Sequence, residues 1–180
     1  MKPKRVTVFL SSSQNVSPLY FSELENLARG LAKLNIEIVY GGACVGLMGH
    51  MADCALANKG RVFGVIPEYL NQPGIVHEGL TELNVVSDLL DRKRAMLKGT
   101  EAVIAFPGGI GTIDEITEVM ALKQLGEYQG PIYFVNFLES WQALFDCFYE
   151  LKERGMISQN LSDLYTEYAS STELLKSWSL

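Results

Sequence analysis

The sequence lacks the features that would place it in a membrane or join it by disulfides. No stretch approaches the roughly 18 unbroken apolar residues that a membrane helix needs. Its three cysteines, Cys44, Cys54 and Cys147, are an odd number without a CxxC pair, which is typical of reduced thiols. The basic start at residues 1–5 runs directly into Val6–Leu10, which is too short for a signal-peptide core. We therefore expect a cytoplasmic protein with no membrane partner.

The chain also has no excess of positive charge. Its 15 lysines and arginines are outnumbered by 21 aspartates and glutamates, which gives a net charge of −6. Binding a nucleic-acid duplex needs a basic face, so we expect no nucleic-acid partner, although a few local donors can hold one small phosphorylated ligand. We expect no metal either, because Cys44, His50 and Cys54 have different loop and helix contexts and lack a fourth ligand.

What the sequence does contain is an alternation of short apolar runs with helical patterns. The apolar runs predict strands at Val6–Leu10, Ile36–Tyr40, Arg61–Ile66, Leu83–Val86, Ala102–Phe106 and Pro131–Phe137, with one short extended piece after residue 155. Helices are predicted at about 18–34, Leu47–Ala57, about 88–98, Thr112–Leu125, Trp141–Arg154 and near Thr172–Trp178. This order predicts a single α/β domain over residues 1–180, with a Rossmann-like, doubly wound, mostly parallel sheet and helices on both faces.

Two of the predicted strands end in glycine-rich loops that open helices, at Gly41–Gly49 and Pro107–Thr112. In a doubly wound sheet, ligands bind beyond the carboxyl ends of the strands, where the strand order reverses. We therefore expect both loops, including Gly41 and Gly42, to lie at the ligand site.

The second loop has the composition of a phosphate site. Glycines let an anion approach the backbone, and the free N–H groups and dipole of the following helix favour a phosphate. We expect the ligand phosphate at Gly108, Gly109, Ile110, Gly111 and Thr112. Neither GxxxxGK[ST] nor GxGxxG occurs, which favours a monophosphate over a triphosphate or dinucleotide. One alternative stays open: the glycines only make a turn, and Thr112-x-x-Glu115 is a capping box.

The segment Pro107–Glu115 reads PGGIGTIDE, which resembles the PGGxGTxxE signature of the Lonely Guy family. The similarity extends in order to YGGACVGLMG at Tyr40–Gly49, GVIPE at Gly64–Glu68 and DRKRAM at Asp91–Met96. Members of this family are cytokinin riboside 5′-monophosphate phosphoribohydrolases, often labelled lysine decarboxylases. The resemblance implies a Rossmann-like fold, a homodimer and, without a cofactor, hydrolysis of a purine nucleoside 5′-monophosphate to free base and ribose 5-phosphate. Adenine-type nucleotides such as AMP, including N6-modified ones, are the expected substrates.

The chain departs from the family pattern at two places. Ala43 stands where members usually carry a third glycine, and Leu89–Asp91 stands where they carry Met-His-Glu. The second difference leaves the preferred base open.

The expected reaction assigns roles to the charged residues. Breaking an N-glycosidic bond develops positive charge on the ribose, which a nearby carboxylate stabilises. Glu115 shares a helix face with Thr112, so a phosphate on the loop puts the ribose close to it. The resemblance implies that Glu115 and Arg92 are catalytic, with Arg92 orienting ligand and carboxylate because a guanidinium stays protonated. It also implies that Lys93 contributes to substrate binding. Without the resemblance, the charge pattern at Arg92 favours a solvated basic turn instead.

Other side chains have more ordinary interpretations. Met48 and Met51 are expected in the core, and Met96 is expected to line the pocket. An aromatic run with helical spacing is expected in the core or at a dimer interface, and comprises Trp141, Phe145, Phe148 and Tyr149. The departing base needs a proton, for which Asp88, Asp91 and Glu118 are candidates that the sequence does not separate.

Three further functions remain as alternatives. A non-catalytic carrier of a nucleotide or other phosphorylated ligand could share the fold, but it needs no carboxylate near the anion. Amino-acid decarboxylation needs a pyridoxal lysine, and neither glycine loop contains one. Hydride transfer is disfavoured by the missing dinucleotide fingerprint.

Overall fold

The computed structural model describes residues 2–178, and it builds them around one parallel sheet. Residues 1, 179 and 180, which the predicted domain includes, lie outside the described residues. The strands are β1 (Arg5–Phe9), β2 (Glu37–Tyr40), β3 (Val62–Pro67), β4 (Glu82–Val86), β5 (Ala102–Ala105), β6 (Ile132–Val135) and β7 (Thr166–Tyr168). All neighbouring pairs of these described strands are parallel. The predicted α/β class is confirmed, and β7 is the short extended piece expected in the tail.

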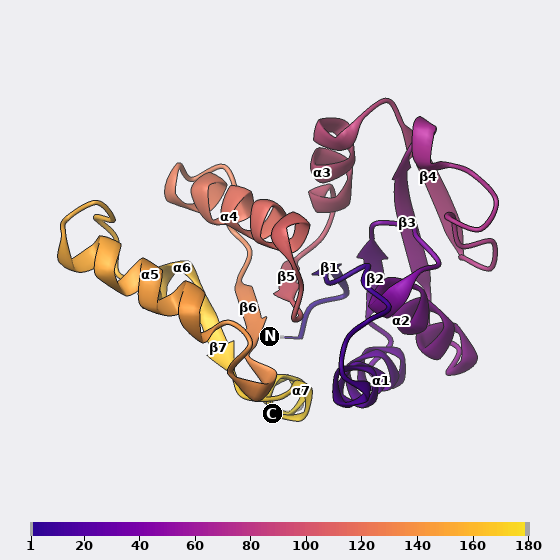
Figure 1. The fold of residues 1–180 in the computed structure, drawn as a ribbon, viewed down its shortest axis with the longest axis horizontal. Coiled ribbons are helices and arrows are strands. Elements are labelled where there is room, and N and C mark those ends of the chain that lie inside the picture. The colour runs from indigo at the N-terminus through magenta and orange to yellow at the C-terminus, as the bar shows by residue number, and fades with distance from the viewer. Residues whose placement is uncertain (1, 179–180) are drawn as a thin grey trace.

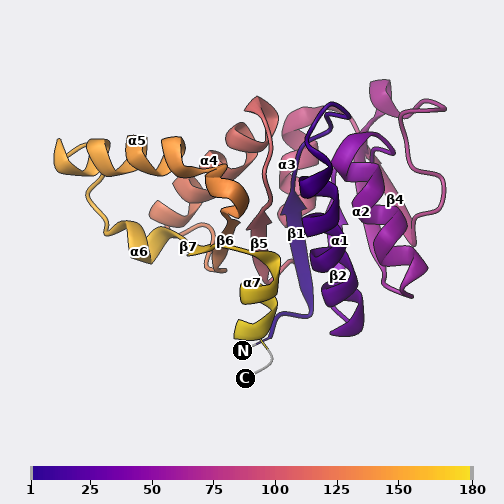
Figure 2. The ribbon, with the colours of Figure 1, turned by 60° about the horizontal axis from the view of Figure 1, so that its bottom comes forward.

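Helices cover both faces of the sheet, as predicted (Figures 1 and 2). They are α1 (Pro18–Lys33), α2 (Gly46–Ala57), α3 (Leu89–Leu97), α4 (Ile110–Gln124), α5 (Gln142–Glu153), α6 (Leu161–Leu164) and α7 (Ser171–Ser177), with 3₁₀ turns η1 (Glu68–Leu70) and η2 (Phe137–Glu139). Helices α1, α2 and α7 pack on one face, and α3 to α6 pack on the other. Within residues 2–178, no helix has the length and apolar character needed to span a bilayer.

Apolar stripes at helical spacing hold these layers together. Leu24, Leu27 and Leu31 of α1 are fully buried against the sheet, and α2 adds Met51. Each such side chain contributes about 1.5–3 kcal/mol when it is removed from water. On the other face, the aromatic run divides: Trp141, Phe145 and Phe148 are buried in the core, whereas Tyr149 is 62% exposed.

The strand order reverses at the first strand. The sheet runs β4-β3-β2-β1-β5-β6-β7, so the chain moves outward from β1 to one edge and then returns to the other side of β1. Strands β1 and β5 end side by side, with Phe9 paired to Ala105. The loops that follow them lead to α1 on one face and α4 on the other. Since these loops diverge, a crevice forms between them at the carboxyl edge.

Candidate active site

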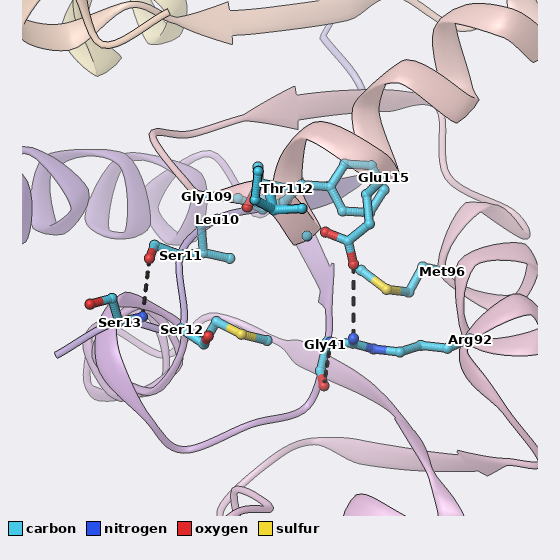
Figure 3. Close-up of a pocket in the computed structure, with 15 residues that line it drawn as sticks. Leu10, Ser11, Ser12, Ser13, Gly41, Arg92, Met96, Gly109, Thr112 and Glu115 are labelled. Carbon is cyan, nitrogen blue, oxygen red and sulfur yellow. Dashed lines mark hydrogen bonds and ion pairs between the residues drawn. The ribbon is translucent and has the colours of Figure 1, made fainter.

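A cavity of about 340 Å³ lies in this crevice (Figure 3). It includes most of the residues that the sequence pointed to: Gly41, Arg92, Met96, Gly109, Ile110, Gly111, Thr112 and Glu115. Met48 and the end of β1 with its loop, residues 8–13, also line the cavity, although none of them was predicted there. The volume is that of a small-molecule pocket.

The floor of the cavity is the amino-terminal end of α4. The N-cap is Gly109, which supplies no side-chain cap, and the first α-helical bond runs from Ile113 N–H to Gly109 C=O at 3.0 Å. The N–H groups of Ile110, Gly111 and Thr112 therefore have no carbonyl partner within the helix. Together with the helix dipole, they form a site for an anion.

The capping-box interpretation of Thr112 and Glu115 is wrong. It required the helix to begin at Thr112, but α4 begins two residues earlier, so Thr112 is its third residue and Glu115 lies in its second turn. A residue in the second turn cannot return its side chain to the N-cap N–H as a capping glutamate does. Glu115 therefore does not cap the start of the helix.

The glycines of this loop have two different reasons to be glycine. A methyl group on Gly109 or Gly111 would meet no protein atom within 4 Å, and neither residue has a positive φ. The backbone does not require glycine at these two positions, and their bare Cα atoms leave the approach to the N–H groups open. Gly108 differs, because a Cβ there would come within 2.1 Å of the Thr112 hydroxyl.

Arg92 is held in the cavity wall by two backbone carbonyls, one within β3 and one directly after β2. Asp88 caps α3 by accepting from the N–H groups of residues 90 and 91, which places Arg92 one turn later. Its Nε donates to the Val65 carbonyl at 3.1 Å, and its Nη2 donates to the Gly41 carbonyl at 3.0 Å. A Cβ on Gly41 would lie 1.6 Å from Nη2, so glycine makes room for the guanidinium. Only 15% of the side chain is exposed, and the solvated-turn interpretation of Arg92 is wrong.

Glu115 faces this guanidinium across the cavity (Figure 3). Its Oε1 lies 3.9 Å from Arg92 Nη1, and the side chain is 14% exposed. Burial raises the pKa of Glu115 to about 7, with Arg92 opposing the shift and Asp114 adding to it. The carboxyl group therefore gains and loses its proton near neutral pH.

Lys93 points elsewhere. It does not line the cavity; its Nζ lies 3.2 Å from Asp114 Oδ2 and is in still closer contact with Glu118 Oε2. Gly42 also lies outside the lining and turns the chain with a φ of 75°. The substrate-binding roles expected for Lys93, Gly42 and Gly108 stay predictions.

The three candidate proton donors are engaged away from the cavity. Asp88 caps α3, Asp91 bonds to Ser87 and Arg94, and Glu118 pairs with Lys93. Among the cavity-lining residues that the structure describes, Glu115 alone carries a carboxyl group.

A serine triplet forms the opposite wall and was missed by sequence reasoning. Ser11, Ser12 and Ser13 follow β1 and face the start of α4, and Ser13 N–H donates to the Ser11 hydroxyl at 3.0 Å (Figure 3). The sequence marked these residues only as a loop. The signal that could have found them is their place after the strand at which the sheet order reverses.

Comparison with known sequences gives a consistent result. A family model described as "Possible lysine decarboxylase" matches residues 48–177. The chain is 40% identical over 157 residues to a cytokinin riboside 5′-monophosphate phosphoribohydrolase of Rhodococcoides fascians, across 87% of this chain and 79% of the relative. It is 36% identical over 176 residues to a phosphoribohydrolase of the same name from Arabidopsis thaliana, across 97% of this chain and 82% of the relative.

Solved structures with a similar fold include the molybdenum cofactor carrier protein of Chlamydomonas reinhardtii. The superposition has a TM-score of 0.72 and covers 99% of this chain and 97% of that chain. At 16% sequence identity, this likeness shows the fold alone.

Proposed function

Since the chain belongs to the Lonely Guy family of cytokinin riboside 5′-monophosphate phosphoribohydrolases, we propose that it hydrolyses the N-glycosidic bond of an adenine-type nucleoside 5′-monophosphate. The products are the free base and ribose 5-phosphate. One observation carries the proposal beyond family membership: the buried Glu115 carboxyl group lies 3.9 Å from Arg92, in the same cavity as the free N–H groups of α4.

Binding begins with the 5′-phosphate at the start of α4. The N–H groups of Ile110, Gly111 and Thr112 supply donors, and the absence of side chains at Gly109 and Gly111 leaves room for the anion. The serine triplet faces this position and offers hydroxyl groups to the phosphate or the ribose. A phosphate held here puts the ribose beside Glu115, one turn further along the helix.

Bond cleavage then depends on charge. The electron pair of the C1′–N9 bond leaves with the base, and the ribose becomes positively charged at C1′. The Glu115 carboxylate stabilises this charge and accepts a proton from the attacking water, whose oxygen bonds to C1′. The departing base takes up a proton from solvent at a ring nitrogen, and Glu115 later returns its proton to solvent, so the base leaves in its neutral form. Arg92 stays protonated and bound to the carbonyls of Val65 and Gly41, so its role is to fix the carboxylate and the substrate.

Carrier function is the main competing proposal. A carrier needs the phosphate site but gains nothing from a buried carboxylate beside it, because a negative charge there opposes the anion. Pyridoxal chemistry does not fit the cavity: none of its described lining residues is a lysine that could form a Schiff base, and Lys93 is paired with two carboxylates of α4.

Base release from a panel of nucleotides tests the proposal. Purified protein is incubated with AMP, N6-substituted AMP, GMP and adenosine, and the free base is quantified by chromatography. We expect release from the adenine monophosphates and a much lower kcat/KM for adenosine, because the phosphate supplies much of the positioning energy. Equal kcat/KM for AMP and adenosine, or no release from any nucleotide, contradicts it.

We also propose that the active form is a homodimer with its site near the interface. Large apolar side chains are exposed at the starts of the two helices that carry Arg92 and Glu115, with Leu89 at 48% and Leu90 at 57% on α3 and Ile110 at 83% on α4. Light scattering at the working concentration tests this, and a fully active monomer contradicts it. A cytoplasmic location is part of the same proposal, supported by Cys44, Cys54 and Cys147, which are all free thiols.

A further inference from the structure

Two consecutive cations of α3 contact three carboxylates on one stretch of α4. Arg92 faces Glu115 in the cavity, and the next residue, Lys93, contacts Asp114 and Glu118 outside it. Asp114 is adjacent to Glu115 in the sequence, and Glu118, three residues further on, shares its face of the helix. Both acids raise the pKa of Glu115. The five side chains form one charged cluster that joins the two helices.

Lys93 is confined in this cluster. Only 13% of its side chain is exposed, although Asp114 is 63% exposed and Glu118 is 34% exposed. Its partners raise the pKa of the Lys93 ammonium, led by the bond to Glu118, so the cation is firmly held. A long side chain fixed between two carboxylates is not free to reach a substrate on the far side of α4.

From this geometry, we propose that Lys93 is a positioning residue that neutralises Asp114 and Glu118 and so lets Glu115 act as a carboxylate beside Arg92, rather than a ligand for the substrate. The inference rests on the proposed function only for its effect on kcat/KM. The state of the Glu115 carboxyl group can be followed without any turnover.

The charges that act on Glu115 come from these two helices. Asp114 and Glu118 on α4 raise its pKa, and Arg92 and Lys93 on α3 lower it. The lining contributed by β1 and its loop, and by Gly41 after β2, carries no titratable side chain. Removing one cation or one acid of the cluster should therefore move the titration of Glu115 in opposite directions, which a loss of packing alone would not do.

The experiment compares Lys93→Met with Glu118→Gln. Glu115 titration is followed by NMR of protein labelled with ¹³C at glutamate carboxyl groups, and its signal is identified by its loss in Glu115→Gln. The kcat/KM for AMP is measured over the same pH range. We expect Lys93→Met to move the midpoint of the Glu115 titration up by about half a pH unit. On the acid side of the profile, kcat/KM should then fall roughly threefold, while its value at the alkaline plateau is retained. Glu118→Gln should move it down, and the double variant should return it close to the wild-type value.

Arg94→Met is the matched control, because it removes a cation from the same helix. Arg94 is 75% exposed and pairs with Asp91, away from the cavity, so the Glu115 midpoint should not move. Lys93→Arg should restore the wild-type profile.

Two outcomes would overturn the inference. If Lys93→Met raises KM at every pH without moving the NMR midpoint, Lys93 is a substrate ligand. If Lys93→Met and Glu118→Gln lower only the melting temperature, the cluster is merely structural and Lys93 does not tune Glu115. If the NMR midpoints move as expected but no variant or wild-type protein turns over AMP, the result contradicts the proposed function and leaves the role of Lys93 supported.

Discussion

Glu115 Oε1 and Arg92 Nη1 lie 3.9 Å apart, which is within ion-pair range and beyond hydrogen-bond range. Arg92 directs its Nε and Nη2 donors to the carbonyls of Val65 and Gly41, so the pair is fixed from the arginine side. The carboxylate is attracted by the guanidinium without being covered by it. Its oxygens remain available to a water molecule or to a positively charged ribose in the cavity.

Glu115→Gln should abolish most turnover while leaving nucleotide binding largely intact. The amide keeps the shape of the side chain but cannot stabilise a ribosyl cation or accept a proton. We expect kcat to fall by about 10² or more, the scale observed when an electrostatic stabiliser is lost. Base release gives kcat, and calorimetric titration with AMP gives the affinity. Wild-type turnover in this variant would remove Glu115 from the mechanism. The control is Glu153→Gln, the same substitution at an exposed position on α5, which should leave turnover unchanged.

The activity should depend on pH through the same group. Because the pKa of Glu115 is raised to about 7 and its carboxylate is the active form, kcat/KM should fall about tenfold per pH unit below neutrality. Above about pH 8 it should reach a plateau. Measurements of kcat/KM for AMP between about pH 5 and 9 test this, and a profile that rises toward acid would instead make Glu115 a proton donor.

Glu115 should also make the fold less stable as the pH rises. Its pKa is 4.5 in an unfolded chain and about 7 in the fold, so the folded state keeps a proton that the unfolded state releases between these values. The associated stability is present below pH 4.5 and is lost as the pH rises to 7, about 3 kcal/mol in all. The melting temperature of Glu115→Gln minus that of wild type should therefore be several degrees larger at about pH 8 than at about pH 4. A pH-independent difference would show that burial of this charge does not destabilise the fold.

Much of this arrangement was predictable from the sequence. Alternating strand and helix patterns give the doubly wound sheet, and the rule that ligands bind at its carboxyl edge correctly brings Gly41 and the loop before α4 to one cavity. Arg92 was assigned to the same site by the family resemblance and also lines the cavity. The start of α4 was not predictable in this way. Capping preferences select a side chain such as that of Thr112, whereas the fold uses Gly109 and leaves the N–H groups open. A helix start that ordinary capping rules misplace coincides here with the proposed phosphate site.

The contacts of Lys93 show a second limit. Helical periodicity gives the direction of a side chain about its own axis, but it does not say which neighbouring helix that side chain meets. Asp114 and Glu118, which pair with Lys93, come next to it only after the chain has formed β5 and returned along α4. The serine triplet was missed for a similar reason, since the pairing of β1 with β5 alone brings it to face α4.

Gly41→Ala should reproduce the effect of Arg92→Ala. A Cβ at position 41 would lie 1.6 Å from Arg92 Nη2, so the guanidinium must leave its place between the two carbonyls. Each change should raise KM for AMP and lower kcat, with the larger effect on affinity. Because both act on the same interaction, the double variant should be no worse than the more severe single variant. Additive losses would show that Gly41 serves the site in some other way.

Gly111→Ala separates the phosphate site from the stability of the helix that forms it. The residue is the second of α4, its φ is not positive, and a methyl group there meets no protein atom within 4 Å. Alanine favours a helix over glycine by up to about 1 kcal/mol, so the melting temperature should stay the same or rise. The same methyl group would stand at the cavity wall where we propose that the phosphate binds, so we expect KM for AMP to rise about tenfold or more.

Adenosine supplies the control for this variant. It has no phosphate to collide with the methyl group, so its low kcat/KM should change little between Gly111→Ala and wild type. A thermal melt and steady-state kinetics with AMP and adenosine measure all three quantities on one preparation. Stable protein with unaltered KM for AMP would mean that the phosphate binds away from the start of α4. The ribose would then no longer be directed to Glu115, and the catalytic geometry proposed for this cavity would fail with it.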